Sequence, residues 1–347
     1  MNNMQRMVLA ARPDGAIKDS DLRLESRAMP EPGEDEVLVR VVWLSVDPYM
    51  RGRMDGSPSY AEPVQLGEPM VGGAVGQVMR SRNSRFAEGD WVSGQLGWQT
   101  HAVASGGDLR KLDPGIAPVS TALGLLGMPG FTAYVGLIDL GKPKAGETIV
   151  VSAASGAVGS LVGQLARING LRTVGVAGSD EKCAYAVEEL GFDTCISHRL
   201  GDAGELRKHL AEACPGGVDI YYENVGGKTL EAVAPLMNVF GRIPVCGMIS
   251  WYDQGGLGAG ATDGANQLPG VWRSILVNRL QVNGFIITDH AHRFREFVDV
   301  VSGHYRNGRI RYRESIVEGL ESAPRALADV LQGRNFGKQL VKVAEET

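Results

Sequence analysis

The sequence predicts a two-domain α/β protein, with a β-rich domain joined to a doubly wound parallel sheet. Three observations support this prediction. The chain has 347 residues, more than one hydrophobic core usually holds. Up to about residue 125, short apolar runs alternate with glycine and proline turns. From about residue 130, continuous apolar runs alternate with stretches of helical periodicity, the pattern of a right-handed, mostly parallel sheet.

The β-rich region is predicted from a few short runs. Glu36–Ser45 is apolar and β-branched, and Gly72–Met79 and Asp90–Leu96 are shorter runs with glycine breaks. We expect a small barrel-like or partly open antiparallel unit. The last run, Lys338–Val343, is also a predicted strand, and it could rejoin this unit because chain termini often come together.

The parallel sheet is predicted from strand and helix pairs. Thr148–Ala153 is a continuous apolar run, which is typical of a strand buried on both faces, and Val158–Ile168 has helical spacing. Thr173–Ala177 and Asp180–Leu190 repeat the pair. Three further strands are predicted at Val218–Tyr222, Arg242–Cys246 and Leu280–Ile287.

Composition argues against several classes of protein. The formal net charge of −5 and the lack of a basic stripe argue against a nucleic-acid partner. No apolar run approaches the roughly 20 residues of a membrane helix, and the first residues do not resemble a signal peptide. The four cysteines form no CxxC pair, so we expect free thiols in a cytoplasmic protein.

A candidate cofactor motif lies at Val150–Gly159, between a predicted strand and a predicted helix. Gly156 would let the backbone approach a pyrophosphate, and Gly159 would let the helix pack on the strand. The helix N-terminus would face the phosphates. The first glycine of the usual triplet is absent, with Ala154 nearby, so a tight turn that binds nothing is the alternative.

The end of the second strand favours NADP over NAD. An NAD enzyme places an acid there for the ribose 2′-hydroxyl, whereas this strand runs into Gly178 and Ser179. Lys182 follows within one helical turn and could pair with a 2′-phosphate. Asp180 could be read as the missing acid, but we interpret it as a cap of the following helix.

Polar residues also follow the later strands. Asn224 comes after Val218–Tyr222, and the loop 246–252 comes after the next strand. Ligands of open α/β sheets lie beyond the carboxyl ends of the strands. We therefore expect both segments to face the ribose and nicotinamide.

Several segments together resemble one family. They are DPYMR at 47–51, MPGFTAY at 128–134, SAASGAVGS at 152–160, GSDEK at 178–182, ENVGG at 223–227 and GRNFGKQL at 333–340. The chain resembles the prostaglandin reductase / leukotriene B4 12-hydroxydehydrogenase branch of the zinc-independent medium-chain dehydrogenases/reductases. Residues 47–73 resemble its bacterial NADPH-dependent curcumin reductases most.

The resemblance implies a GroES-like catalytic domain at 1–127 with 312–347, a Rossmann NADP(H)-binding domain at 128–311, and a homodimer. It implies reduction of the C=C bond of α,β-unsaturated aldehydes and ketones, with hydride passing from NADPH to the β-carbon. The cofactor contacts that it implies are Pro48, Met128, Thr132, Gly156, Ala157, Val158, Gly159, Gly178, Ser179, Lys182, His198, Asn224, Cys246, Gly247, Met248, Ile249, Tyr252, Phe285, Ile286, Ile287, Asn335 and Gly337.

Two positions depart from the family pattern. Many members have a tyrosine near the 2′-phosphate where this chain has His198, followed by Arg199. Val277 stands where animal and plant members have a substrate-site tyrosine, so a proton donor there is lost. Zinc dehydrogenases carry a GHE motif, but Gly67-Glu68-Pro69 lacks the histidine, and we predict no metal.

Conjugate reduction needs a donor for the charge that collects on the carbonyl oxygen. Tyr252 is our first candidate and Tyr60 the second, although each could instead serve only for packing. Tyr49, Tyr60 and Trp251 are predicted to line the substrate pocket. The alternatives are an NADPH:quinone oxidoreductase and a non-catalytic NADPH-binding structural or sensor protein.

Overall fold

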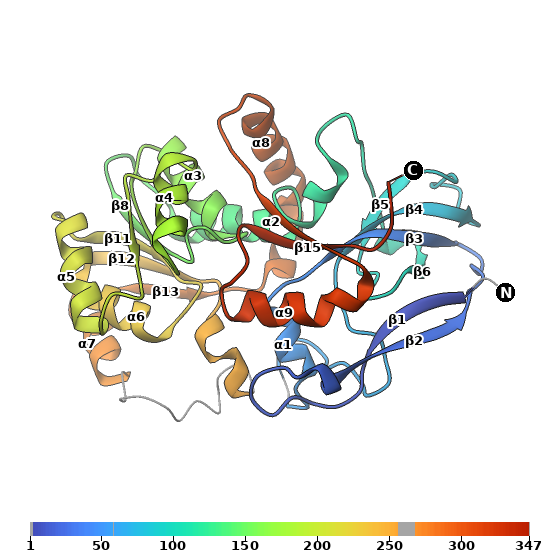
Figure 1. The fold of residues 1–347 in the computed structure, drawn as a ribbon. Helices are drawn as coiled ribbons and strands as arrows, with labels where there is room; N and C mark the ends of the chain where they lie inside the picture. The colour runs from blue at the N-terminus through green and yellow to red at the C-terminus, as the bar shows by residue number, and fades with distance from the viewer. Residues whose placement is uncertain (1–2, 58, 256–267, 347) are drawn as a thin grey trace. The chain divides into compact units, whose positions relative to one another are not determined.

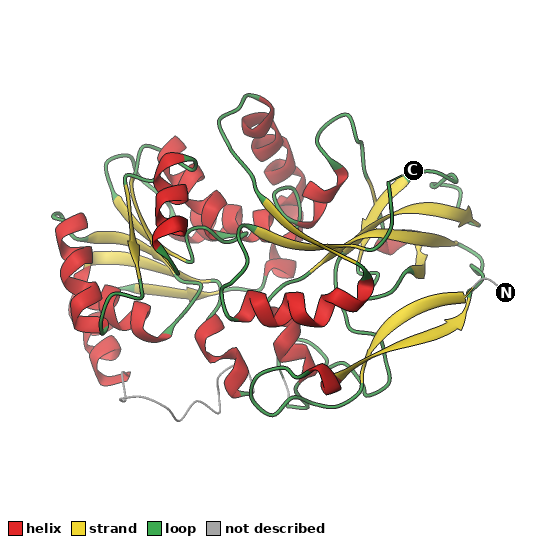
Figure 2. Cartoon of the chain, viewed as in Figure 1, coloured by secondary structure: helices red, strands yellow, loops and turns green. Residues whose placement is uncertain are grey.

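The computed structural model describes residues 3–57, 59–255 and 268–346. It divides into two compact units, each with its own sheet (Figures 1 and 2). The first unit takes in the described parts of 1–127, 252–261 and 314–347. The second takes in those of 128–251 and 262–313.

The first unit contains a mixed sheet and a separate hairpin. In the described residues the sheet has seven strands, and β14 and β15 pair in parallel while the other pairs are antiparallel. Along the sheet the order is β14 (Glu314–Glu318), β15 (Lys338–Lys342), β3 (Glu36–Ser45), β4 (Ala74–Ser81), β5 (Trp91–Gly94) and β7 (Arg110–Lys111), with β6 (His101–Ser105) paired to β3. The hairpin is β1 (Asn3–Leu9) and β2 (Leu22–Ala28), and the helices are α1 (Tyr49–Met54) and α9 (Ala323–Leu331).

Strand β3 is the centre of this unit because both of its faces are covered. Val37, Val39 and Val41 belong to the larger apolar cluster, while Val42 and Trp43 belong to a second cluster. All five residues are buried. The continuous apolar run therefore reflects burial on both faces, and its bounds are those that the sequence predicts.

The second unit is a six-stranded parallel sheet in the described residues. Its strands are β8 (Thr148–Ser152), β9 (Arg172–Ala177), β10 (Thr194–Ser197), β11 (Val218–Tyr222), β12 (Met237–Val245) and β13 (Gln281–Gly284). Their spatial order, β10-β9-β8-β11-β12-β13, is the doubly wound order of dinucleotide-binding sheets. The order reverses between β8 and β11, where such sheets bind their ligands.

Helices cover this sheet (Figure 1). They are α2 (Met128–Val135), α3 (Gly159–Ile168), α4 (Asp180–Glu188), α5 (Ala203–Ala213), α6 (Gly227–Val233), α7 (Leu268–Asn278) and α8 (Phe294–Arg306). Helix α3 packs tightly, since a side chain at Gly163 would overlap the Phe192 ring. The fold is therefore the predicted combination of a β-rich domain and a Rossmann-type domain.

The structure differs from the prediction in several strands. Strands β6, β7, β10 and β14 and the β1–β2 hairpin are not predicted; β10 has only four residues, and β2 is largely exposed. Strand β12 begins at Met237, earlier than predicted. Strand β13 ends at Gly284, because the chain then enters the 3₁₀ segment Ile287–Arg293. Among the helices of the described ranges, none has the length and hydropathy needed to cross a membrane.

Candidate functional site

The turn between β8 and α3 is tightly constrained by its glycines. Ala153 has a positive φ of 51°, and its carbonyl oxygen accepts a 2.9 Å hydrogen bond from the Gly156 amide. A Cβ at Gly159 would lie 2.9 Å from the Ala153 carbonyl carbon and nearer still to its oxygen. At Gly156 a Cβ would lie 3.2 Å from that oxygen. Only Gly159 is therefore required by the packing of the turn itself.

The point where the strand order reverses is fixed by Ser152. Its hydroxyl lies 3.1 Å from the Tyr222 carbonyl oxygen and accepts a 2.8 Å hydrogen bond from the Asn224 amide. The Asn224 side chain in turn donates to the Ser152 carbonyl at 2.8 Å. The predicted ribose residue Asn224 is thus held at the ends of β8 and β11, directly beside the glycine turn.

Glu223 is a buried carboxylate in the turn 223–227 and was not predicted as a site residue. Glu223 is 3% exposed and accepts main-chain hydrogen bonds from Val225 at 2.7 Å and Gly226 at 2.9 Å. Burial raises the pKa of Glu223 in spite of these bonds. The sequence places a polar residue at the strand end, but only the fold shows that it is buried.

Backbone hydrogen bonds join the turn 223–227 to the loop 246–251, and we call this pairing the loop zipper. The Glu223 carbonyl accepts from the amides of Cys246 (2.9 Å) and Gly247 (3.1 Å). The Asn224 carbonyl accepts from Ile249 at 3.2 Å. The structure therefore brings together Asn224, Cys246, Gly247, Met248 and Ile249.

Trp251 has a packing role in the same unit. Gly226 has φ 74°, and a Cβ there would lie 2.6 Å from the Trp251 ring. The glycine therefore makes space for the indole, which is half-buried. Trp251 therefore packs against the turn at Gly226, which is an alternative role to the predicted one in the substrate pocket.

The end of β9 is a cationic site. Ser179, not Asp180, is the N-cap of α4, and its hydroxyl accepts a 3.3 Å hydrogen bond from the Lys182 amide. Asp180 is the first residue within the helix, an acid in the first turn beside the capping serine. A Cβ at Gly178 would lie 3.5 Å from His198 Nε2, so the imidazole lies next to the strand end.

Lys228 is a member of this site that the sequence analysis missed. It lowers the pKa of His198 through its charge, together with Arg199 and Lys182, after the larger effect of burial. Its ammonium group donates to the Gly201 carbonyl at 3.0 Å. It follows the GG turn at 226–227, and only the folded sheet brings that turn to the end of β10.

Other predicted contacts lie elsewhere in the second unit. Thr132 donates to the Met128 carbonyl at 2.8 Å, and its own carbonyl accepts from the Tyr222 hydroxyl at 2.7 Å. This places α2 against β11. Phe285, Ile286 and Ile287 follow β13, and the Phe285 ring meets His290 edge-on at 6.2 Å.

In the first unit, a buried ion pair fixes the DPYMR segment. Lys338 is 1% exposed, and its ammonium lies 2.7 Å from the Asp47 carboxylate and donates to the Val46 carbonyl at 2.9 Å. Pro48 follows as the N-cap of α1. Lys338 comes directly after Gly337, which has φ 69° and whose carbonyl accepts from Asn335 at 2.9 Å. Pro48, Asn335 and Gly337 are therefore held by one network.

Two predicted pocket tyrosines are neighbours in this unit. Burial, then the charges of Asp47 and Tyr60, raise the pKa of Tyr49. Tyr49 is half-buried, whereas Tyr60 is 51% exposed. The structure thus groups Tyr49 and Tyr60 on and just after α1.

Tyr252 precedes Asp253, which forms an ion pair with Arg51. Arg51 is fully buried; its guanidinium lies 2.6 Å from the Asp55 carboxylate and 3.5 Å from that of Asp253. Burial raises the pKa of Asp253, against the effect of Arg51. Sequence reasoning missed this ion pair because the two residues are far apart in the chain.

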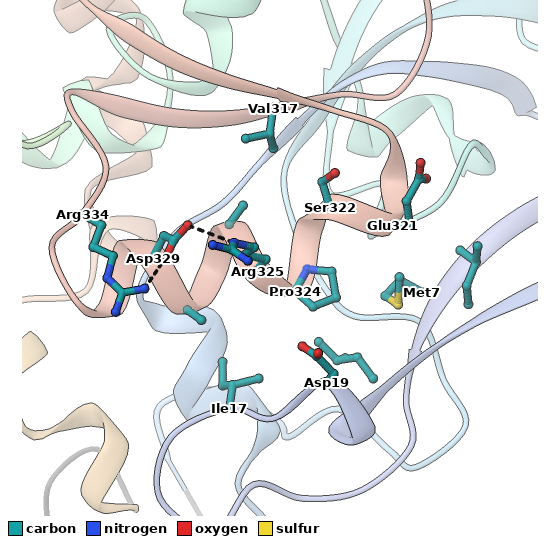
Figure 3. Close-up of a pocket in the computed structure, with 14 residues that line it drawn as sticks. Met7, Ile17, Asp19, Val317, Glu321, Ser322, Pro324, Arg325, Asp329 and Arg334 are labelled. Carbon is teal, nitrogen blue, oxygen red and sulfur yellow. Dashed lines mark hydrogen bonds and ion pairs between the residues drawn. The ribbon is translucent and has the colours of Figure 1, made fainter.

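A hollow in the first unit lies away from these residues (Figure 3). It measures about 670 Å³, and Arg325 and Arg334 at its wall both pair with Asp329. Its lining includes none of the predicted site residues. Within the described ranges, no three His, Cys, Asp or Glu side chains are grouped to hold a metal ion, and the four cysteines are free thiols.

Comparisons with known proteins agree with this architecture. Residues 5–112 match the family described as the N-terminal domain of oxidoreductase, and residues 157–303 match the family described as zinc-binding dehydrogenase. The chain is 49% identical over 341 residues to the NADPH-dependent curcumin reductase of Escherichia coli (strain K12), covering 98% of this chain and 97% of that protein. It is 39% identical over 348 residues to the NADP(+)-dependent 2-alkenal reductase of Nicotiana tabacum, covering 99% and 98%.

A solved structure extends the match to three dimensions. CurA from Vibrio vulnificus in complex with NADPH superposes with a TM-score of 0.92 at 45% identity, covering 99% of this chain and all of that one. The match therefore includes both units and nearly every residue. The chain belongs to the zinc-independent medium-chain dehydrogenase/reductase family, in the branch that contains curcumin reductases, 2-alkenal reductases and prostaglandin reductases.

Proposed function

We propose that the protein is an NADPH-dependent reductase of the C=C bond of α,β-unsaturated aldehydes and ketones. One observation carries the proposal. The glycine turn, the point of strand-order reversal and a cationic strand end lie on one edge of one sheet, in a chain of this family. These three features match the pyrophosphate, ribose and 2′-phosphate of NADPH in turn.

The residues of the second unit fit the cofactor. Gly156 with Ala157, Val158 and the start of α3 would hold the pyrophosphate, since no side chain at Gly156 stands in its way. Gly178, Ser179, Lys182 and His198 would hold the 2′-phosphate. The loop zipper, with Met128, Thr132 and the segment 285–287, would hold the ribose and nicotinamide. When bound, NADPH supplies the hydride that reduces the β-carbon.

The first unit, with the predicted contacts at Pro48, Asn335 and Gly337, would supply the substrate-binding side chains.

 The charge that develops on the carbonyl oxygen requires a hydrogen-bond donor, and we assign this role to Tyr252, with Tyr60 as the second candidate. Tyr49, Tyr60 and Trp251 would line the substrate pocket. The predicted limits of the catalytic domain, 1–127 with 312–347, and of the cofactor domain, 128–311, form part of the same proposal.

The proposal includes a cytoplasmic homodimer. Along α7, Leu268, Trp272 and Leu276 form an apolar stripe at a spacing of four residues, and they are 60%, 66% and 77% exposed. Strand β13 is the last strand of the sheet in the described residues, and Val282 on it is 44% exposed. An open strand edge beside an apolar helix favours pairing with a second copy of the chain.

The activity test is NADPH oxidation at 340 nm, run in parallel with 2-nonenal, 4-phenyl-3-buten-2-one, curcumin and a quinone. We expect turnover on the enal and enones, much less with NADH than with NADPH, and a saturated carbonyl product. Turnover on the quinone alone would replace the proposal with a quinone oxidoreductase. NADPH binding without turnover on any of these substrates would support the alternative, a non-catalytic NADPH-binding protein.

The dimer is tested by measuring molar mass in solution. We expect the mass of a dimer for the wild type and of a monomer for Trp272→Glu, which introduces a charge into the apolar stripe. Val187→Glu on α4 is the matched control, because Val187 is an exposed apolar residue outside the stripe. A monomeric wild type would refute this part of the proposal.

A further inference from the structure

Cations from three parts of the second unit act on the imidazole of His198. Lys228 lies at the start of α6, Arg199 follows His198 in the chain, and Lys182 lies in the first turn of α4. All three lower the pKa of His198 through their charges. His198 Nε2 lies beside Gly178, where the absence of a side chain leaves space at the strand end.

The acids Glu181 and Asp202 act on the cations and are not among the groups that act on the imidazole. Glu181 acts on Lys182, whose pKa is lowered chiefly by burial and then by Arg199. Asp202 is the N-cap of α5, accepting from the Glu205 amide at 2.9 Å, and its pKa is lowered chiefly by such backbone bonds. Neither acid is among the groups that shift the pKa of His198. The site as a whole is therefore suited to an anion.

This concentration of positive charge is costly without a ligand. Like charges repel, and each cation favours the neutral form of the imidazole. A phosphate carrying close to two negative charges reverses this effect, because it attracts the cations and favours the imidazolium form. An imidazolium can donate a charge-assisted hydrogen bond to a phosphate oxygen, whereas the neutral ring carries only one N–H.

We propose that His198 and Lys228 are specificity residues for the 2′-phosphate of NADPH. His198 takes up a proton from solvent when the phosphate binds, so that the preference for NADPH over NADH increases as the pH falls. This inference rests on the proposed function, and it adds Lys228 and a proton linkage to that site.

The direction of the pH dependence follows from the two states of His198. In the free protein its pKa lies below the ordinary 6.5, and beside the bound phosphate it lies higher. The contribution of His198 to affinity for the 2′-phosphate is therefore greatest below the pKa of the free state. It declines as the pH rises through the pKa of the bound state.

The test is calorimetry with 2′,5′-ADP and 5′-AMP, which differ only in the 2′-phosphate. Titrations at pH 7 in buffers of different ionisation enthalpy measure the protons taken up. We expect greater net proton uptake with 2′,5′-ADP than with 5′-AMP, since the 5′-phosphate is common to both nucleotides. The 2′-phosphate itself, with a second pKa of about 6, would release protons on binding as a dianion, so its contribution has the opposite sign.

Variants assign the effect to residues. His198→Asn should abolish the uptake and weaken 2′,5′-ADP binding more at pH 6.5 than at pH 8.5. Lys228→Met should weaken it about ten-fold at either pH, the usual effect of losing a hydrogen bond to a charged group. Lys208→Met is the matched control, because Lys208 lies on α5 and acts on Asp202 but not on His198. All three variants should keep the 5′-AMP affinity of the wild type, which reports an intact fold.

The outcomes separate this inference from the proposed function. If the protein binds 2′,5′-ADP and reduces enones, but neither variant changes affinity or proton uptake, the inference alone is overturned. If it binds 2′,5′-ADP no better than 5′-AMP, the assignment of NADPH fails and the inference fails with it.

Discussion

The two glycines of the β8–α3 turn are predicted to respond differently to alanine. In Gly159→Ala, the new methyl group would lie 2.9 Å from the Ala153 carbonyl carbon and 3.1 Å from the Ala154 Cα, and closer still to the Ala153 oxygen. Ordinary contact between non-bonded atoms needs more than about 3 Å, so the start of α3 must move by roughly 1 Å to clear the Ala153 oxygen. Forcing a methyl group into such a space costs about 2 kcal/mol.

This cost should appear as a lower melting temperature. For a unit of this size, about 2 kcal/mol corresponds to a decrease of roughly 4–8 °C. NADPH affinity should fall as well, because the displaced helix start no longer presents its amides to the pyrophosphate. Differential scanning calorimetry and a fluorescence titration with NADPH measure the two effects.

Gly156→Ala is the matched control within the same turn. Its methyl group would lie 3.2 Å from the Ala153 oxygen, which calls for only a small adjustment, and Gly156 does not have a positive φ. We expect a melting temperature within about 1 °C of the wild type, together with weaker NADPH binding, since the methyl group would occupy the approach to the pyrophosphate. Equal melting temperatures for both variants would refute this account of the turn.

Three further variants test other parts of the structure. Glu223→Gln keeps an oxygen for the main-chain donors and removes a carboxylate whose pKa is raised by burial. Because the buried carboxylate is costly when ionised, the variant should gain stability over the wild type as the pH rises above 4.5. Urea unfolding at pH 5 and pH 8 should show a larger gain in the free energy of unfolding at pH 8. Lys338→Met leaves the buried Asp47 without its ion-pair partner and should lower the free energy of unfolding by about 3–5 kcal/mol in the same assay. Adding Asp47→Asn should restore much of this stability. No recovery in the double variant would show that the broken ion pair does not cause the loss. Tyr252→Phe should lower kcat for 2-nonenal by about 10²-fold, with a smaller effect of Tyr60→Phe, and unchanged kcat in both variants would remove the tyrosine-donor proposal.

The sequence predicts those strands and turns that depend on residues close together in the chain. Glu36–Ser45 and Val218–Tyr222 form strands with the predicted bounds, because their apolar runs are long and end at turn-forming or polar residues. The glycine turn before α3 is also local, since Gly159 is needed within six residues of Ala153. Strand β10 has only four residues and three of them are half-buried, so it lacks such a signal.

The parts of the candidate site that were missed depend on contacts between distant segments. Lys228 reaches the end of β10 only because β11 and β10 lie in one sheet, and Glu223 is buried only because β8 and β12 flank β11. Ser179 rather than Asp180 caps α4 because the main chain of Ser179 is extended, with φ −164° and ψ 162°, a choice that composition does not determine.

The loop zipper has a consequence for how this enzyme family can change over time. The bonds that join the turn 223–227 to the loop 246–251 run from amide to carbonyl, so they do not depend on the side chains of Met248 and Ile249. Cys246 differs, because its thiol is hydrogen-bonded to Tyr222. Replacing the side chains of Met248 and Ile249 alters the surface of the loop without altering its course. Laboratory evolution aimed at new substrates can therefore randomise Met248 and Ile249 together and still begin from a folded, correctly shaped backbone.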